Sequence, residues 1–139
     1  MFKRFAFNWK AQTAHGLHSP FVFDLYTQVI DPIYHLKPMD VQDALIHGIG
    51  KHLKLAAGRI QIIDFGQLKA SELPMIHKLM DDQEQILMCI NIRKTEESLQ
   101  YWAFMAGQAQ AIHSIELFEM GIISLKPIAP KQHFYLKKS

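Results

Sequence analysis

A chain of 139 residues has the length of one average domain and can bury roughly 70% of its unfolded surface, so we expect a core that needs no disulfide. With 49% hydrophobic and 20% charged residues, the composition argues against a disordered chain. The formal net charge of +2 indicates neither nucleic acid nor a membrane as partner, and no apolar run reaches the ~18–20 residues that span a bilayer. The single cysteine, Cys89, cannot form an internal disulfide, which favours a cytoplasmic location.

Residues 1–58 have the spacing of helices. A first helix is predicted by an apolar stripe at i, i+3, i+4 and i+7, made of Phe2, Phe5, Ala6 and Trp9. Ser19 is a typical N-cap for a second helix over Pro20–Ile30. This helix should end at Asp31, because Pro32 disfavours helical geometry in the residue before it.

A third helix is predicted to begin after Asp40, which can cap it. Its apolar residues recur every four positions: Val41, Leu45, Ile49 and Leu53. Gly58 is expected to end this helix, since glycine readily adopts the conformation that closes a helix.

From residue 59 onward the pattern alternates between strands and helices. The predicted strands are Arg59–Phe65, Gln85–Ile92, Ala111–Phe118 and Gly121–Lys126, with a further short extended segment at His133–Leu136. The predicted helices are Ser71–Met80 and a segment that Thr95 opens and Gly107 closes. Only two residues separate the third and fourth strands, which indicates an antiparallel hairpin.

This order of elements predicts an α/β fold. Strands that alternate with helices form right-handed βαβ units, so we expect a mostly parallel sheet of about four strands that ends in the antiparallel hairpin. The chain shows no linker or repeat. We therefore expect a single domain over residues 1–139, in which the helical region 1–58 packs on the sheet of residues 59–139.

Two polar residues are expected at the carboxyl ends of neighbouring strands. Asp64 ends the first predicted strand and Asn91 ends the second. In open α/β sheets, ligands bind beyond the carboxyl ends of the strands, so both residues are candidates for binding a cofactor. The alternative is that they cap the turns that follow, which is a common role of Asp and Asn.

Other motifs that carry chemistry are missing or incomplete. The sequence has no glycine-rich nucleotide loop and no phosphate-binding loop. His15 and His18 lie three residues apart, but a zinc site needs at least a third protein ligand, so we interpret them as structural and expect no metal. Cys89 lies in the middle of an apolar strand, which is typical of an inert buried thiol.

Two segments carry a resemblance to a known family. Ala14–Leu25, with the sequence AHGLHSPFVFDL, and the end of the chain, Ile115–Ile123 followed by Lys131–Phe134, resemble bacterial class I S-adenosylmethionine-dependent methyltransferases similar to small-molecule O-methyltransferases. The resemblance implies a Rossmann-like sheet, in which Ile62–Asp64 matches the family's fourth strand and Ile86–Ile92 matches its fifth.

The departures from the family concern its cofactor. The glycine-rich loop after the first strand and the acidic residue for the ribose have no counterpart, and the acidic pair after the fifth strand is replaced by Ile90-Asn91. Only Asp64 carries over. Without that loop the backbone N–H groups that grip the cofactor are missing. An alternative alignment that makes Ile62–Gly66 the family's first strand and loop supplies no second glycine either.

We therefore expect a shortened, degenerate methyltransferase-like domain that is non-catalytic and acts as a binding or oligomerisation module, with no cofactor. The alternative is an S-adenosylmethionine-dependent methyltransferase for a small molecule whose site is completed by a partner chain. Loss of the family's first three strands would make Arg59–Phe65 a sheet edge with little protection, since only Arg59 and Gln61 are polar along the strand before its end. We expect a symmetric homodimer through this strand, and a proline at Ile62 should disrupt both assembly and stability.

Overall fold

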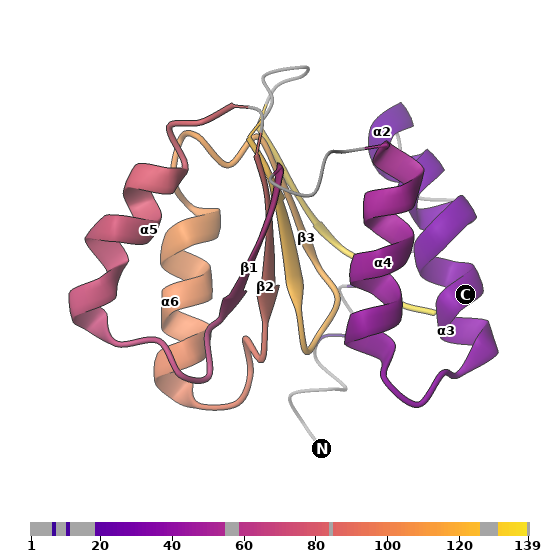
Figure 1. Cartoon of the computed structure of the whole chain (residues 1–139), viewed down its shortest axis with the longest axis horizontal. Helices are drawn as coiled ribbons and strands as arrows, with labels where there is room; N and C mark the ends of the chain where they lie inside the picture. The colour runs from indigo at the N-terminus through magenta and orange to yellow at the C-terminus, as the bar shows by residue number, and fades with distance from the viewer. Residues whose placement is uncertain are drawn as a thin grey trace.

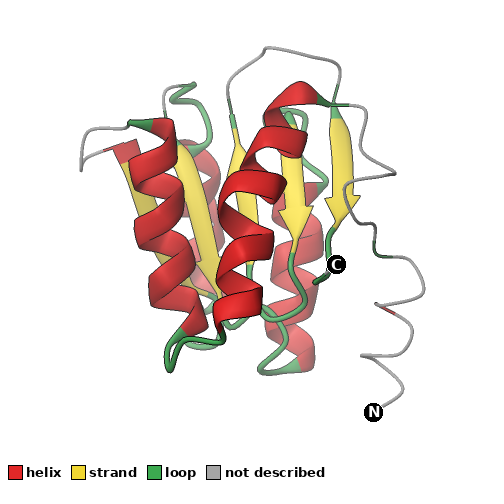
Figure 2. Ribbon diagram, turned by 90° about the vertical axis from the view of Figure 1, so that its right-hand side faces the viewer, coloured by secondary structure: helices red, strands yellow, loops and turns green. Residues whose placement is uncertain are grey.

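The protein is a sheet with helices on both faces. The computed structural model describes residues 7, 11, 19–54, 59–83, 85–125 and 131–138. Helices α2 (Pro20–Leu25), α3 (Asp31–Leu36) and α4 (Val41–Leu53) lie on one side of the sheet, and α5 (Leu73–Leu79) and α6 (Glu96–Ala106) lie on the other (Figure 1). Figure 2, turned by 90°, shows the N-terminal helices in front of the strands. The expected packing of the helical region on the sheet is confirmed for the described helices.

The strands of the described residues are β1 (Ile60–Asp64), β2 (Ile86–Ile90), β3 (His113–Glu116), β4 (Gly121–Ser124) and β5 (Gln132–Tyr135), and their order in the sheet is β1-β2-β4-β3-β5. β1 pairs with β2 in parallel and β3 with β5 in parallel, whereas β4 is antiparallel to both of its neighbours. The α/β class and the β3–β4 hairpin are confirmed.

The expectation of a mostly parallel sheet is wrong, because the sheet of the described residues is mixed. It has five strands where about four were expected, and the fifth lies in the extended segment predicted near the C-terminus. The hairpin turns back so that β4 lies between β2 and β3, which puts the antiparallel strand inside the sheet. The short segment near the C-terminus then adds β5 beside β3.

The second helix continues where it was expected to end. Ser19 caps α2, with its hydroxyl accepting a hydrogen bond from the Val22 N–H at 3.4 Å. A π-helical segment over Tyr26–Ile30 follows and leads directly into α3, with the Asp31 N–H bonded to the Tyr26 carbonyl. Pro32 would clash with a carbonyl of the preceding α-helical turn, and the wider π turn relieves that clash. The predicted stop at Asp31 is therefore wrong.

The third helix agrees with its prediction at the start and is shorter at the end. The Asp40 carboxylate caps α4 by accepting from the Asp43 N–H at 3.0 Å. The helix ends at Leu53, where Lys54 adopts the left-handed conformation with a φ of 53°. Gly58, the expected end, lies outside the described residues, as do His15, His18 and, apart from Phe7, the predicted first helix.

In the second half of the chain, α6 is capped as the sequence predicts, whereas α5 begins differently. Thr95 and Ser98 exchange hydrogen bonds at the start of α6, each at 2.9 Å, and Gly107 closes the helix. A short 3₁₀ turn over Ala70–Glu72 precedes α5, where the Glu72 carboxylate accepts from the Lys69 N–H at 3.0 Å. The helix thus begins two residues later than the expected Ser71.

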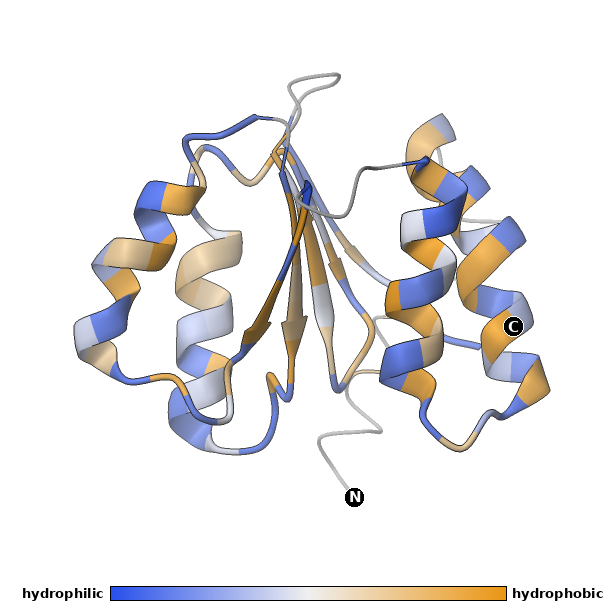
Figure 3. Ribbon diagram, in the orientation of Figure 1, coloured by the Kyte–Doolittle hydropathy of each residue, from blue (hydrophilic) through white to orange (hydrophobic). Residues whose placement is uncertain are grey.

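Alternating side chains of the strands build a core on each face of the sheet. On β2, Ile86 and Met88 pack with the N-terminal helices, and Leu87 and Cys89 pack with α5 and α6. Figure 3 shows the strands coloured mainly as hydrophobic, whereas the helices also carry hydrophilic residues. Within the described ranges, no helix is both long and apolar enough to cross a membrane.

Candidate functional site

The structure brings together the two residues that sequence reasoning singled out. Asp64 ends β1, and Asn91 follows β2, its parallel neighbour. The Asn91 side-chain amide donates a hydrogen bond to Asp64 Oδ1 at 3.0 Å, and the Gly66 N–H donates to the same oxygen at 3.0 Å. Asp64 therefore closes the turn after β1 and links the ends of two strands.

Neighbouring side chains fill the space around this pair. A Cβ built on Gly66 would lie 2.6 Å from Cδ of Lys94, so the lysine side chain covers the turn. On the other side, the Asn91 N–H donates to Gln42 Oε1 of α4 at 3.4 Å. Asn91 itself has a φ of 57°, which suits a residue that caps a strand end. The contacts of Asp64 and Asn91 thus fit residues that cap the turns after their strands.

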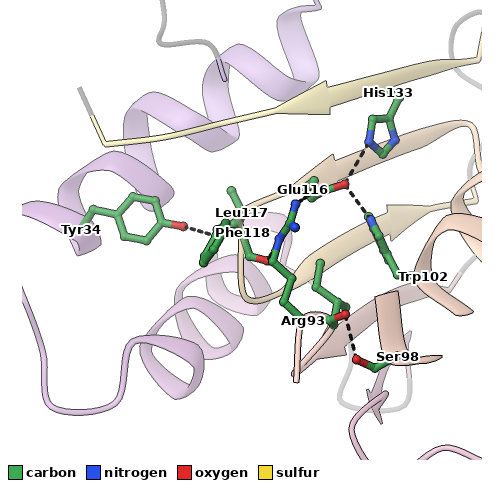
Figure 4. A network of polar contacts seen from close by, with 9 residues as sticks. Tyr34, Arg93, Ser98, Trp102, Glu116, Leu117, Phe118 and His133 are labelled. Atoms are coloured by element: carbon green, nitrogen blue, oxygen red, sulfur yellow. Dashed lines mark hydrogen bonds and ion pairs between the residues drawn. The ribbon is translucent and has the colours of Figure 1, made fainter. Parts of the chain in front are cut away.

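A second polar cluster, which the sequence analysis missed, surrounds the buried carboxylate of Glu116 at the end of β3 (Figure 4). The Trp102 indole N–H of α6 donates to Glu116 Oε1 at 2.9 Å. The Arg93 guanidinium donates to Oε2, and His133 Nε2 of β5 lies 3.5 Å from Oε1. One carboxylate thus connects a helix, the loop after β2 and the edge strand β5.

The electrostatics of the cluster favour the charged form of Glu116. Burial alone raises the pKa of this carboxyl, but hydrogen bonds from His133 and Trp102, together with the charge of Arg93, outweigh it and lower the pKa below its ordinary value. Arg93 is held in turn, because its Nε donates to the Phe118 carbonyl at 2.9 Å and its guanidinium lies over the Phe118 ring at 4.6 Å.

The cluster also contains a hydrogen-bonded row of serine, histidine and carboxylate. The Ser114 hydroxyl is bonded to His133 Nδ1, and His133 Nε2 faces Glu116. Such rows activate serine nucleophiles in hydrolases. Here Ser114 is fully buried, so its hydroxyl has no access to a substrate. The cluster braces the β3–β5 side of the sheet.

A pattern in the sequence could have revealed this cluster. Ser114 and Glu116 are two residues apart in a strand that is buried throughout, so they share one face, and a polar pair on a buried face needs partners. Trp102 and His133 come from distant segments, and no local pattern identifies them.

The remaining candidates do not form a site. Cys89 is buried, and burial raises the pKa of its thiol, in agreement with the predicted inert thiol. Among the described residues, no group of three or more histidine, cysteine or acidic side chains is placed to hold a metal ion.

Comparisons with known proteins do not assign this geometry to a family. No protein-family profile, curated protein or solved structure matches the chain.

Proposed function

We propose that this chain is a shortened methyltransferase-like domain without catalytic activity, and that it acts as an oligomerisation module which forms a symmetric homodimer through β1. The observation that supports this proposal most strongly is the place of β1 at the end of the strand order, where β2 is its one neighbour among the described strands. A strand edge offers a row of backbone donors and acceptors that a second chain can pair with.

The hydrogen bonds to β2 define which residues of β1 face the open edge. The Phe65 N–H bonds to the Ile90 carbonyl at 3.0 Å, so Phe65 points toward β2. In a parallel ladder alternate residues point the same way, which directs Ile63 and Gln61 toward β2 as well. Ile62 therefore directs its N–H and its carbonyl away from the sheet, toward a possible partner.

Side chains at this edge offer little protection against pairing. Ile62 is 55% exposed although its neighbours along the strand are partly buried. Arg59 could guard the edge by its charge, but its guanidinium pairs with Asp82 at 3.7 Å. Gln61 lies on the opposite face of the strand from Ile62. Burying the exposed half of Ile62 in both protomers would contribute about 2 kcal/mol to association.

Helix α5 adds exposed apolar side chains beside the edge, on the face of the sheet opposite to the Ile62 side chain. His77 on this helix is hydrogen bonded to Gln108 after α6, at 3.1 Å, so that side of α5 faces α6. Met75 and Leu79 lie on the other side of the helix, away from α6, and both are exposed. A two-fold axis through Ile62 would bring the α5 helices of two copies near each other, so a second copy of this chain would cover β1 and these side chains together.

The alternative function, a methyltransferase completed by a partner chain, predicts a different measurement. Such an enzyme should bind S-adenosylmethionine or S-adenosylhomocysteine, whereas the contacts around Asp64 and Asn91 oppose a cofactor at that strand end. A calorimetric titration with each compound separates the two proposals. We expect no binding tighter than ~100 μM, and a tighter complex would favour the enzyme.

Light scattering at ~100 μM protein tests the homodimer, with two proline variants that differ by one residue. Ile62→Pro removes an outward N–H and should give a folded monomer. Ile63→Pro removes a donor to β2 and should unfold the protein. From the sequence we expected a proline at Ile62 to disrupt both assembly and stability. Because the Ile62 N–H points away from β2, we now expect this proline to disrupt assembly alone. A wild-type chain that is monomeric at this concentration would refute the proposal.

A further inference from the structure

A half-open pocket lies at the edge of the sheet where the parallel strands end. It has a volume of about 210 Å³ and lies between the end of α3, the turn after β3 and the segment after β5. Leu117 follows β3 and Leu136 follows β5, and both line it. Ligands of α/β proteins bind at the carboxyl ends of strands, so the pocket has the position of a binding site. It lies toward the β3–β5 side of the sheet, at the opposite side from β1.

Aromatic rings form part of the wall. Phe7, Tyr34 and Phe118 line the pocket. Phe7 and Phe118 pack edge to face, with their ring centroids 5.4 Å apart. Tyr34 is fixed against the turn after β3, because its hydroxyl donates to the Leu117 carbonyl at 3.4 Å. Flat apolar walls of this kind suit an aromatic ring.

The backbone holds one of these rings in an unusual conformation. Phe118 has a φ of 72°, in the left-handed region that a bulky residue rarely adopts. The Arg93 N–H that donates to its carbonyl at 2.9 Å and the cation over its ring stabilise this conformation. Strained residues that the surrounding structure holds in place are concentrated at binding sites.

Three lysine residues line the same space. Lys37 comes from the residue after α3, and Lys137 and Lys138 come from the segment after β5. The described residues that line the pocket include no carboxylate. The nearby carboxylate of Glu116 is paired with Arg93, which balances its charge. Positive charge from two separate segments therefore converges on an aromatic wall.

We propose that this pocket binds a small organic anion that has one aromatic ring and a phosphate or carboxylate group. The aromatic walls take the ring, and the lysines take the anionic group. A volume of about 210 Å³ is smaller than that of most drug-sized sites, which limits the ligand to about one ring with its anionic group. Aryl phosphates and aryl carboxylates share this chemistry.

Calorimetric titration with four probes tests the two halves of the proposal. Phenyl phosphate and benzoate carry both the ring and the charge, whereas inorganic phosphate lacks the ring and benzyl alcohol lacks the charge. We expect at least one aryl anion to bind at least tenfold more tightly than either partial probe. Equal affinities of the aryl anions and inorganic phosphate, or the absence of binding by both aryl anions, would refute the proposal.

Lysine variants locate the site. In Lys37→Gln/Lys138→Gln we expect the aryl anion to bind about tenfold more weakly, because a hydrogen bond to a charged group is lost. Lys51→Gln/Lys54→Gln is the matched control, since both are exposed lysines at the end of α4 and the same number of charges is removed. Equal losses of affinity for the aryl anion in the site variant and in the control variant would indicate a general charge effect and refute the site. The titration is repeated with Ile62→Pro, the variant expected to be monomeric. We expect unchanged affinity for the aryl anion, so the result does not depend on dimer formation.

Discussion

Gly121, the first residue of β4, lies directly against the indole ring of Trp102, and we predict that Gly121→Ala destabilises the protein by about 3 kcal/mol. A Cβ built on Gly121 would lie 2.2 Å from Cη2 and 2.4 Å from Cζ3 of the indole. No described glycine has a positive φ, so the backbone conformation itself would accept alanine. The predicted cost is steric.

The magnitude follows from what Trp102 would lose by moving. Overpacking a well-filled core costs typically 1–3 kcal/mol. The indole is 1% exposed and its N–H donates to the Glu116 carboxylate at 2.9 Å, so a shift of the ring weakens a hydrogen bond to a charged group that is worth about 1.5–3 kcal/mol. Alanine recovers about 0.4–1 kcal/mol by restricting the unfolded chain. The net loss is therefore about 3 kcal/mol, a large part of the stability of an ordinary domain.

Urea denaturation followed by tryptophan fluorescence measures this loss. Gly50→Ala is the control, because its Cβ would approach only the end of the Ile60 side chain, at 3.0 Å, and alanine is favoured in a helix. We expect the free energy of unfolding of the control to stay within about 1 kcal/mol of wild type. If Gly121→Ala changes it no more than the control does, the packing argument for Trp102 is wrong.

Two further predictions concern single side chains. Asp64→Asn should lower the free energy of unfolding by less than about 1 kcal/mol, because the amide keeps an oxygen that can accept from Gly66 and Asn91. Asp64→Ala loses this acceptor and should lower the free energy of unfolding by about 1–3 kcal/mol. Equal losses of the two variants in urea denaturation would contradict this prediction. His113 is buried between two aromatic rings, and burial lowers its pKa below the ordinary value of 6.5, so stability should be fully present above pH 6.5 and fall below it. His113→Phe should abolish the loss between pH 6.5 and 5, and an unchanged slope would assign the acid loss to another group.

Local patterns predicted most of the elements because their causes are local. The caps at Asp40 and Thr95 and the apolar spacing of α4 depend on residues three or four positions apart, and both helices begin as expected. The proximity of Asp64 and Asn91 also followed from a general rule, since the carboxyl ends of adjacent parallel strands meet at one edge of a sheet.

The errors arose where distant segments decide the outcome. The sequence order of the strands does not specify that β4 lies between β2 and β3, so the mixed sheet was missed. Pro32 remains helical because the preceding turn widens into a π-helical segment. The packing of Tyr26 and Ile30 in the core stabilises this wider turn. The partners of Glu116 come from β5, α6 and a loop, which a strand pattern cannot reveal.

The two edges of the sheet differ in a way that makes the proposed dimer testable at one residue. β5 carries exposed polar residues, Gln132 and His133, and Tyr135 at its end packs against Phe7. Polar residues and covering contacts of this kind discourage pairing at the β5 edge. β1 instead exposes the apolar side chain of Ile62. Self-association should therefore use β1. In an antiparallel pair centred on Ile62, this residue lies opposite its own copy.

A cysteine at that position should cross-link the dimer. Directly opposite residues in a hydrogen-bonded antiparallel pair have Cα atoms about 5.5 Å apart, within the ~4.4–6.8 Å range of disulfides. The native Cys89 is buried and its pKa is raised, so it adds no background. On a non-reducing gel after mild oxidation, Ile62→Cys should run as a covalent dimer and Gln132→Cys as a monomer. Cross-linking of Gln132→Cys alone would place the interface at β5, because a disulfide forms rapidly only where two copies of the same residue meet.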